Sequence, residues 1–419
     1  MRMLTGGIDF GTSNSTIGIV ENGKPRLVML EQGHIALPSA VFFSFEDNQT
    51  YYGRRAIEDY TAHAEGRLMR ALKSVLGTSL IHEKTRIKTR SMAFSDILGS
   101  FMGHLKHRLD EARGGDVDHV VLGRPVQFVD DDEAADAQAQ QQLETIARAQ
   151  GFRHVAFQFE PIAAALDYEQ NVTREELALI ADIGGGTSDF SVIRVSPDRS
   201  NLPDRKKDIL ANTGVHIGGT DFDRLFSVAH VMPELGYLTP TKDGKRNLPV
   251  GYFFDLATWH RINLLYSKKA MIDLRQMRYE AARPELLDRM IDIVSNRQGH
   301  ALAAHVENAK VALASEPEAS IEVELTDARL DIPVNVKDLE VAIDRAVGRI
   351  GDTVARTLAD AGLKPSQIDT VFLTGGSTAI ESVRRHILHL MPNARVVEGD
   401  MFGSVGLGLA LDASRKFGH

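Results

Sequence analysis

The sequence contains no cysteine and a single tryptophan. The absence of cysteine excludes disulfide bonds, thiolate catalysis and cysteine-ligated zinc, so chemistry must come from carboxylates, lysine, threonine and histidine. No apolar run reaches the roughly 18 to 20 residues that a membrane-spanning helix needs. The first residues also carry no charged-then-apolar leader. We therefore expect a cytoplasmic protein that does not bind membranes.

Excess positive charge is missing too, because the 419 residues carry a net charge of −9. Nucleic-acid-binding proteins normally show a basic face, so we expect no nucleic-acid partner. The apolar share of 43% and the charged share of 25% are those of a globular protein. The length suffices for roughly two or three domain-sized cores.

Strand-like and helix-like segments alternate along the chain, which indicates α/β architecture. The pair Asn22-Gly23 predicts a tight hairpin turn, because it supplies the positive φ angles that primed turns require. Residue periodicity predicts helices over residues 54 to 76, 133 to 150, 256 to 277 and 336 to 361. It predicts strands over 319 to 325 and at the start of 370 to 378.

Two glycine-rich segments repeat one pattern about a domain length apart. Asp9-Phe10-Gly11-Thr12-Ser13-Asn14 and Asp182-Ile183-Gly184-Gly185-Gly186-Thr187-Ser188-Asp189 each read as a strand end, a glycine turn with hydroxyl residues and a second strand. Glycine lets backbone N–H groups converge on an anion, so each turn is predicted to cradle phosphate. One such run is equally typical of a plain hairpin, but two matched copies indicate two related lobes.

Asp9 and Asp182 stand at the ends of the two predicted strands. They cannot contact phosphate directly because like charges repel, but they can hold a hydrated Mg²⁺ ion that bridges to it. A third glycine turn, Thr374-Gly375-Gly376-Ser377, follows a buried strand. This turn permits flat contact with adenine or ribose, although such turns are common without any ligand.

Four segments resemble, in order, the nucleotide signature of the actin, sugar-kinase and heat-shock-chaperone ATPase superfamily. They are residues 9–14, 160–165, 182–189 and 374–377. Within that superfamily the chain is similar to DnaK-type heat-shock chaperones, which residues 71–77, 217–223 and 307–310 also resemble. Residues 123–125 and 402–405 further resemble the short YegD-like members.

The resemblance implies an actin-like ATPase fold of class α/β, in which two duplicated ribonuclease-H-like lobes enclose a nucleotide cleft. Lobe I would cover residues 1–176, and lobe II, with a helical upper subdomain, residues 177–398. A closing strand and helix at 399–419 would return to lobe I. Two crossing helices rich in alanine and glycine, near 162–168 and 404–411, would shear as a hinge.

ATP or ADP with Mg²⁺ would bind between these lobes. The resemblance assigns catalysis to Lys73, Glu160, Asp182, Thr187 and Asp189, with Lys73 and Glu160 orienting the attacking water. Asp9 and Asp182 would hold Mg²⁺ through water. The residues that would contact the nucleotide are Gly11, Thr12, Ser13, Asn14, Gly184, Gly185, Gly186, Thr187, Gly218, Gly219, Glu307, Lys310, Gly375, Gly376 and Ser377.

Without the resemblance, two of these assignments have simpler alternatives. Lys73 reads as a solvent-facing lysine on a helix, and Glu160 as an acid at a helix start. Trp259 is expected in a core rather than in a ligand cage.

The sequence departs from the chaperone pattern in three places. Val311 and Ala379 stand where the chaperones carry two arginines that stack on adenine. This removes two cation–π faces, each worth roughly 0.5 to 2 kcal/mol. Pro125 matches the allosteric proline, but the arginine that relays its signal has no clear counterpart in residues 130–142. The chain ends at His419, so no peptide-binding domain is expected.

We therefore expect a chaperone-like, monomeric ATP-binding protein whose slow hydrolysis drives lobe closure toward an unidentified protein partner or client. Two alternatives stay open. A sugar or small-metabolite kinase of the same fold would need a substrate-facing carboxylate in lobe I, and no convincing candidate lies near the first glycine turn. A non-enzymatic nucleotide sensor or filament former would use the cleft without turnover.

Overall fold

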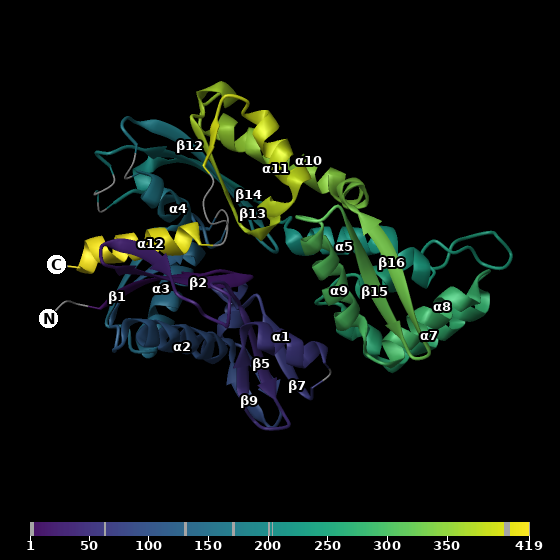
Figure 1. Ribbon diagram of the computed structural model, residues 1–419. Coiled ribbons are helices and arrows are strands. Elements are labelled where there is room, and N and C mark those ends of the chain that lie inside the picture. The colour runs from purple at the N-terminus through teal and green to yellow at the C-terminus, as the bar shows by residue number, and fades with distance from the viewer. Residues whose placement is uncertain are drawn as a thin grey trace.

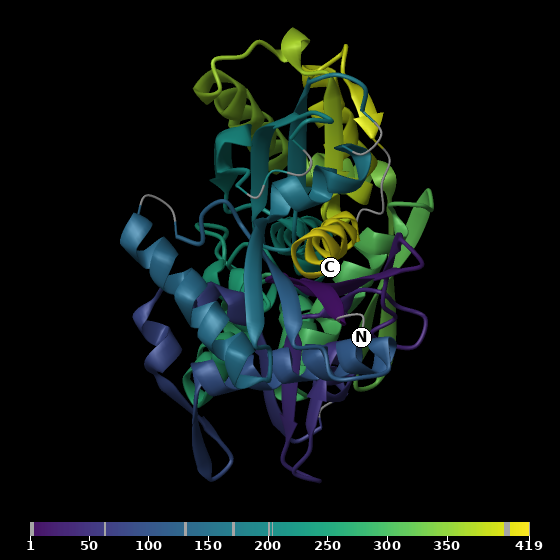
Figure 2. The same ribbon diagram turned by 90° about the vertical axis from the view of Figure 1, so that its left-hand side faces the viewer.

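The computed structural model describes residues 4–62, 64–129, 132–169, 172–199, 202, 204–397 and 403–418. Two lobes, each built on a central β-sheet, lie on either side of a pair of helices, α4 (Glu160–Glu169) and α12 (Ser404–Phe417) (Figures 1 and 2). We call them lobe I, which contains β1, and lobe II, which contains β12. Within the described residues, no helix is long and apolar enough to cross a membrane.

The two central sheets have the same strand order. Read in the same direction, it is β3-β2-β1-β10-β11 in lobe I, where β4 also pairs with β2, and β14-β13-β12-β17-β18 in lobe II. In lobe I, β1 pairs antiparallel with β2 and parallel with β10; in lobe II, β12 pairs antiparallel with β13 and parallel with β17. The duplication predicted from the glycine repeat is therefore visible in the topology. The strands of lobe I are β1 (Thr5–Phe10), β2 (Asn14–Glu21), β3 (Lys24–Leu27), β4 (Leu37–Pro38), β10 (His119–Arg124) and β11 (His154–Phe159). Those of lobe II are β12 (Glu176–Ile183), β13 (Ser188–Val195), β14 (Ile209–Val215), β17 (Thr370–Thr374) and β18 (Arg395–Val397).

Long helices cover the outer face of each sheet. In lobe I they are α2 (Phe94–Arg113) and α3 (Glu133–Ala149), and in lobe II α10 (Val336–Asp360) and α11 (Glu381–Leu390). Helix α10 begins where Asn335 and Asp338 each accept the other's backbone N–H, a capping box. Its buried residues recur every three or four positions from Leu339 to Leu358, which places one apolar stripe against the sheet.

The inner faces of the sheets are covered by the two crossing helices. Helix α12 packs on the lobe I sheet through residues such as Leu409. Helix α4 follows β11 of lobe I, yet Ile162 and Leu166 pack against Ile180 and Ile193 of the lobe II sheet. The helices touch closely, because a Cβ atom on Gly408 of α12 would lie 1.8 Å from the carbonyl oxygen of Ala163 in α4. The chain therefore crosses twice between the lobes at one small-residue contact.

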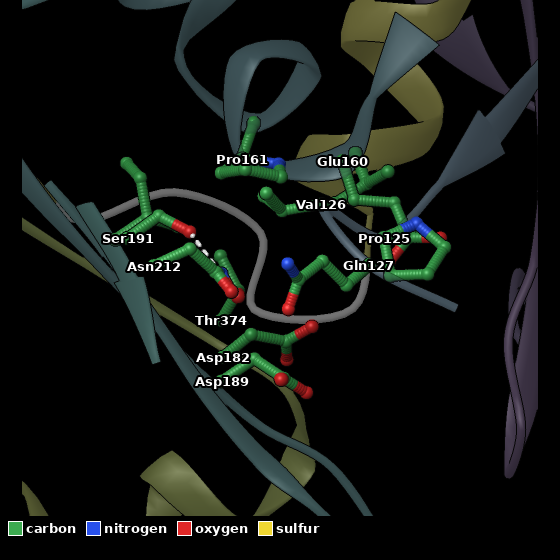
Figure 3. A pocket seen from close by; sticks show the side chains of 13 residues that line it. Pro125, Val126, Gln127, Glu160, Pro161, Asp182, Asp189, Ser191, Asn212 and Thr374 are labelled. Carbon is green, nitrogen blue, oxygen red and sulfur yellow. Dashed lines mark hydrogen bonds between the residues drawn. The ribbon is translucent and has the colours of Figure 1, made fainter. Parts of the chain in front are cut away.

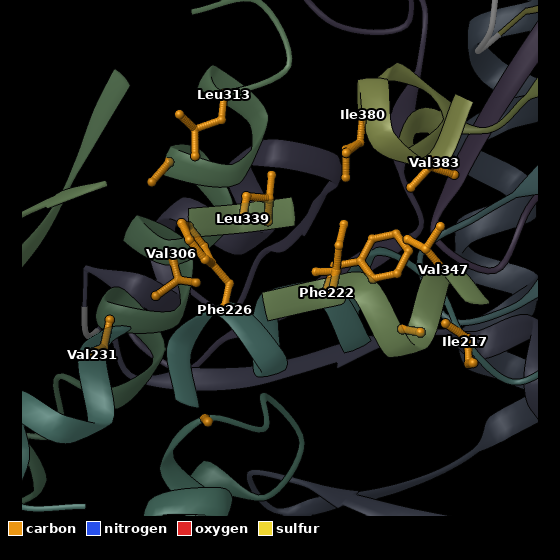
Figure 4. Close-up of a cluster of buried hydrophobic side chains, with 14 of the residues drawn as sticks. Ile217, Phe222, Phe226, Val231, Val306, Leu313, Leu339, Val347, Ile380 and Val383 are labelled. Carbon is orange, nitrogen blue, oxygen red and sulfur yellow. The ribbon is translucent and has the colours of Figure 1, made fainter. Parts of the chain in front are cut away.

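Each lobe also has a second part beyond its central sheet, which we call its upper part. In lobe I it comprises β5 (Ala40–Ser44), β6 (Thr50–Tyr52), α1 (Gly53–Thr61), β7 (Gly66–Arg70), the 3₁₀ turns η1 (Leu72–Val75) and η2 (Ser79–His82), β8 (Lys84–Ile87) and β9 (Arg90–Ala93). In lobe II it comprises α5 (Gly219–Phe226), η4 (Ser227–Val231), η5 (Met232–Leu235), α6 (Gly251–Leu256), η6 (Ile262–Tyr266), α7 (Lys268–Glu280), α8 (Pro284–Ser295), α9 (Gly299–Ala312), β15 (Glu318–Leu325) and β16 (Ala328–Asn335). A continuous apolar core, with Phe222 and Phe226 at its centre, joins α5 and α9 to α10 (Figure 4). Short 3₁₀ turns η3 (Lys206–Asp208), η7 (Pro365–Gln367) and η8 (Gly376–Ala379) complete the fold.

Several local predictions are confirmed. Asn22 and Gly23 adopt positive φ angles of 52° and 80° between β2 and β3. The predicted helices at 133 to 150 and 336 to 361 are α3 and α10, and the predicted strand at 319 to 325 lies within β15.

Two helix predictions are wrong. The helix expected over residues 54 to 76 stops at Thr61, and residues 66 to 70 instead form β7, which pairs with β5. The helix expected over 256 to 277 is broken before Ser267, whose hydroxyl accepts the N–H of Ala270 and begins α7. In the first case pairing with a strand distant in sequence outweighs helical periodicity, and in the second a capping residue interrupts it.

Some predicted features fall partly outside the described residues. The predicted closing segment begins with residues 399 to 402, which lie outside the described residues. The segment expected to lack the relay arginine begins with residues 130 and 131, which also lie outside them.

The contact between the crossing helices makes a testable prediction about stability. Gly408→Ala places a methyl group against the backbone of α4, so we expect it to destabilise the fold by about 1 to 3 kcal/mol. Gly348→Ala in α10 is the matched control, because a Cβ atom there meets nothing within 4 Å. That change should be stabilising by up to about 1 kcal/mol. Urea unfolding of both variants checks the pair, and equal shifts would contradict the packing of α4 on α12.

Candidate active site

The two predicted phosphate turns face each other at the junction of the lobes. The β1–β2 turn contains Gly11, Thr12 and Ser13, and the β12–β13 turn contains residues 184–187. A Cβ atom on Gly185 would lie 2.2 Å from the Ser13 hydroxyl oxygen. Only glycine allows the two turns to approach so closely.

The lobe I turn is held by Ser39. The Ser39 hydroxyl donates to the carbonyl oxygen of Gly11 at 2.7 Å, and its N–H donates to that of Ser13 at 2.8 Å. Asn14 is exposed beside this turn as the first residue of β2. Ser39 therefore fixes the backbone of this turn.

The lobe II turn is held by the start of α5. The N–H of Gly219 donates to Gly184 at 3.0 Å and that of Thr220 to Gly185 at 2.7 Å. Among the hydrogen bonds of the described residues, none uses the N–H of Gly185 or Gly186. These two donors are available to an anion in the cleft.

Lys73 and Glu160 form an ion pair, with Lys73 Nζ 2.8 Å from Glu160 Oε1. Lys73 lies on η1 rather than on a helix, shortly after Ala71 in the left-handed conformation, and its side chain is only 9% exposed. The solvent-facing alternative is therefore wrong. Burial alone would lower the pKa of Lys73, but the neighbouring carboxylates of Glu160 and Asp9 outweigh it and raise this pKa.

Asp9 and Asp182 lie at the equivalent ends of β1 and β12. Burial, reinforced by the Glu160 carboxylate, raises the pKa of Asp9 to about 8. Burial, reinforced by Asp189, raises the pKa of Asp182 to about 7. Two desolvated carboxylates that resist ionisation are a suitable environment for a divalent cation, which would favour their charged forms.

In the part of the chain that the structure describes, no three histidine, aspartate or glutamate side chains are grouped as ligands for a metal ion. An ion between Asp9 and Asp182 would therefore take water for most of its ligands, as Mg²⁺ commonly does.

Thr187 and Asp189 lie together on the hairpin that carries Asp182. The Thr187 hydroxyl donates to Asp189 Oδ2 at 3.3 Å. Asp189 is the register partner of Asp182 on the neighbouring strand. The five residues predicted to act in catalysis thus come from both lobes and meet at one junction.

The residues predicted to contact the nucleoside gather beside the lobe II turn. The Ser377 hydroxyl donates to the carbonyl oxygen of Gly184 at 3.2 Å. Gly375 has a positive φ of 81°, and a Cβ atom there would also lie 2.4 Å from the Ile183 oxygen, so this position requires glycine. Gly218 packs directly on Gly185. Gly376 begins the following turn, η8.

Lys310 carries the positive charge at this end of the cleft. Its Nζ atom lies 2.7 Å from Asp223 Oδ1 and donates to the carbonyl oxygen of Gly219 at 3.2 Å. Burial raises the pKa of Asp223 to about 6, with Lys310 opposing and Glu307 adding to the shift. Asp223 was missed among the site residues, although it ends the segment 217–223 that carried part of the resemblance.

The two positions expected to flank adenine carry no charge. Val311 is 61% exposed on α9, and Ala379 is half-buried at the end of η8.

An additional contact joins the upper parts of the lobes; we call it the upper contact and define it by Tyr60, Arg70, Trp259, Asn263 and His300. The Arg70 guanidinium lies 4.8 Å from the centre of the Trp259 ring, and the Tyr60 ring lies 4.9 Å from that of His300. The Tyr60 hydroxyl also hydrogen-bonds the Asn263 amide. Trp259 is half-buried against Arg70 and His300 rather than placed in a core, so the prediction for it is wrong.

Pro125 lies at the opposite side of the site. It lines a cavity together with Glu160 and Asp182 (Figure 3). The adjacent Arg124 forms an ion pair with Asp136 of α3 at 2.8 Å. An arginine is thus present beside the proline, on the strand before it rather than in the following segment.

A model of the Hsp70 protein family matches residues 5–237 and 277–413 of this chain. The chain belongs to the Hsp70 family. Its fold is accordingly the actin-like ATPase fold, and the resemblance to the DnaK-type ATPase domain is confirmed. The matched ranges leave out residues 238–276, which contain Trp259 and Asn263 of the upper contact.

Curated Hsp70 relatives are similar along nearly the whole chain. A "Chaperone protein DnaK" of Thermus thermophilus is 25% identical over 99% of this chain and 61% of its own length. "Chaperone protein DnaK" of Mycoplasmopsis agalactiae is 26% identical over 90% of this chain and 53% of its own length. The chain therefore spans only about three fifths of the first of these relatives.

The raised pKa values of Asp9 and Asp182 predict how stability without Mg²⁺ depends on pH. Because the folded values, about 8 and about 7, exceed the ordinary 3.8, the folded state binds protons more tightly than the unfolded state. Stability should then fall as pH rises from about 4 to about 8. We expect the thermal midpoint of metal-free protein to follow this course, and Asp182→Asn to flatten it.

The control for this measurement is Asp204→Asn, which changes an exposed aspartate. Its pH profile should match that of the wild type. Mg²⁺ with ADP should raise the midpoint more at about pH 8.5 than at about pH 6.5, because the ion needs ionised carboxylates. If the thermal midpoint of Asp182→Asn fell with rising pH as steeply as that of the wild type, the assignment of the pH dependence to Asp182 would be contradicted.

Proposed function

We propose that this Hsp70-family protein binds ATP with Mg²⁺ between its lobes, hydrolyses it slowly and uses lobe closure as a switch toward a partner protein. The observation that carries this proposal is the close approach of the two glycine turns, in which Gly185 of one lobe packs on Ser13 of the other. Turns from both lobes can grip one phosphate chain only when the lobes are closed. Binding and closure are therefore coupled.

The residues divide into holding and reacting groups. Thr12, Ser13 and Asn14 would contact the β-phosphate side, and Gly184 to Thr187 the γ-phosphate side. Asp9 and Asp182 would hold hydrated Mg²⁺, which supplies charge neutralisation for phosphoryl transfer.

The reacting water would be oriented by the lobe I ion pair. The Glu160 carboxylate, held at 2.8 Å by Lys73, can accept a hydrogen bond from water, and Lys73 can offset charge that develops on the transferred phosphoryl group. Thr187 and Asp189 would receive or relay the proton that this water loses.

The nucleoside would lie along Gly218, Gly219, Lys310 and Ser377, with Glu307, Gly375 and Gly376 beside it. Since Val311 and Ala379 offer the base no cation, most of the affinity should come from the phosphates.

A chaperone role follows from the relatives rather than from the site. Both are named chaperone proteins, and this chain belongs to the same Hsp70 family. We propose that this chain is a cytoplasmic, monomeric, YegD-like member, with residues 1–176, 177–398 and 399–419 as its structural units. Its client is unidentified.

Removing the buried lysine tests the reaction. Lys73→Met deletes the cation beside Glu160, and we expect ATP turnover to fall by about a hundredfold with little change in nucleotide affinity. Lys84→Met, at an exposed lysine on β8, should leave turnover unchanged. Single-turnover assays with radiolabelled ATP and calorimetric titration give the two quantities. Turnover that survives Lys73→Met would refute the proposed active site, and turnover that requires an added sugar would favour a kinase.

The upper contact tests lobe closure. It stands close to the base end, because Arg70 is near enough to influence the pKa of Asp223. We expect Arg70→Met to speed ADP release by about two- to thirtyfold, the equivalent of a lost cation–π contact. Because Trp259 is the single tryptophan, its fluorescence reports on this contact directly.

Arg67→Met, at an exposed position on the same strand, is the matched control. It should leave both the ADP release rate and the tryptophan signal unchanged. Release rates that are equal in the two variants would contradict a role of the upper contact in retaining nucleotide.

A further inference from the structure

A cavity lies behind the catalytic carboxylates, between the lobes. Glu160, Asp182 and Asp189 line it, whereas none of the described residues of the two phosphate turns does (Figure 3). The carboxylates therefore stand between the phosphate turns and this inner cavity. Its other lining residues are Pro125, Val126, Gln127, Pro161, Ala164, Ile180, Ser191, Asn212, Thr374 and Val405.

A second cavity continues the first toward the surface. Val126, Gln127 and Asn212 line both, so the two cavities meet at these residues. The outer cavity extends along β14 to Lys206, which is exposed. The carboxylates are thereby connected to solvent on a side that the phosphate turns do not occupy.

The size and lining of the inner cavity suit water. Its volume of about 40 Å³ is room for about three water molecules at roughly 10 to 15 Å³ each. The Asn212 amide donates to the Ser191 hydroxyl at 3.0 Å, and Figure 3 shows Gln127 pointing into the same space from lobe I. Each of these groups can hold a water molecule by hydrogen bonds.

We propose that the two cavities form a water passage that supplies the attacking water and returns its proton to solvent, with Asn212, Ser191 and Gln127 as positioning residues. This inference rests on the proposed ATP hydrolysis. In that reaction a water oxygen bonds to the γ-phosphorus, the bond from the γ-phosphorus to the bridging oxygen breaks with ADP as leaving group, and the water gives up a proton. In-line attack requires the water to approach from the side opposite the ADP.

The carboxylates and the passage then act in turn to move the proton from the attacking water to solvent. Asp189, which lines the inner cavity, takes the proton first, and waters held by Asn212 and Gln127 pass it outward. Because the passage enters between the lobes, Gln127 from lobe I and Asn212 from lobe II align only in one arrangement of the lobes. Closure would thus control turnover as well as binding.

The first test alters Asn212. Asn212→Leu keeps nearly the same volume without an amide, and we expect kcat to fall by about tenfold or more while nucleotide affinity stays unchanged. Asn212→Ser restores a hydrogen-bonding group and should recover kcat to within about threefold of wild type. Thr213→Val is the control, because Thr213 on the same strand hydrogen-bonds Thr357 of α10 instead. Equal kcat in Asn212→Leu and Thr213→Val would overturn the passage.

The second test needs no turnover. The chain has no cysteine, so Ser191→Cys provides one thiol inside the inner cavity. With a non-hydrolysable ATP analogue and Mg²⁺ bound, we expect iodoacetamide to alkylate this thiol. Adding Gln127→Trp should slow the reaction by about tenfold by narrowing the passage. Lys207→Trp, at an exposed position outside both cavities, should not.

The outcomes separate this inference from the proposed function. If the wild type binds ATP but never hydrolyses it, the proposed function fails and the passage has no reaction to supply. If the wild type hydrolyses ATP and the Ser191→Cys thiol reacts equally fast with either tryptophan substitution, only the passage is overturned.

Discussion

The structure depends on an unbalanced group of buried charges where the lobes meet. Three carboxylates, Asp9, Glu160 and Asp182, face one lysine, Lys73, in a desolvated space. Burying charges of one sign without full compensation is unfavourable, and the raised pKa values of both aspartates express that cost. A divalent cation with a nucleotide would relieve it. The protein is therefore prepared for a charged ligand at the place where both lobes contribute.

The fold explains how these charges come together. Two sheets of identical strand order each deliver an aspartate at the end of the first strand and a glycine turn immediately after it. The crossing helices α4 and α12 hold the sheets face to face, and α4 begins with Glu160. Small residues at this crossing let the helices pack closely and place no bulky side chain in the way of a sliding motion. One contact thus fixes the position of the site, and in the proposed function it also permits the lobes to close.

Local features of the fold could be predicted from the sequence, whereas contacts between residues far apart in the chain could not. The matched glycine turns were predictable because the same pattern of glycine and aspartate occurs twice, about a domain length apart. Lys73 was predicted on a helix but lies on the 3₁₀ turn η1. Residues 54 to 76 contain no signal that β7 would pair with β5 and end the helix. Asp223, Asn212 and the upper contact were missed because each acquires its role only from neighbours far away in the chain.

In the proposed binding mode, phosphates between two matching turns, rather than the base, hold the nucleotide. Calorimetric titration of the wild type with ADP and with adenosine, both in Mg²⁺, tests it directly. Charge-assisted hydrogen bonds contribute about 1.5 to 3 kcal/mol each, so adenosine should bind at least about a hundredfold more weakly than ADP. Adenosine that binds as tightly as ADP would contradict the account.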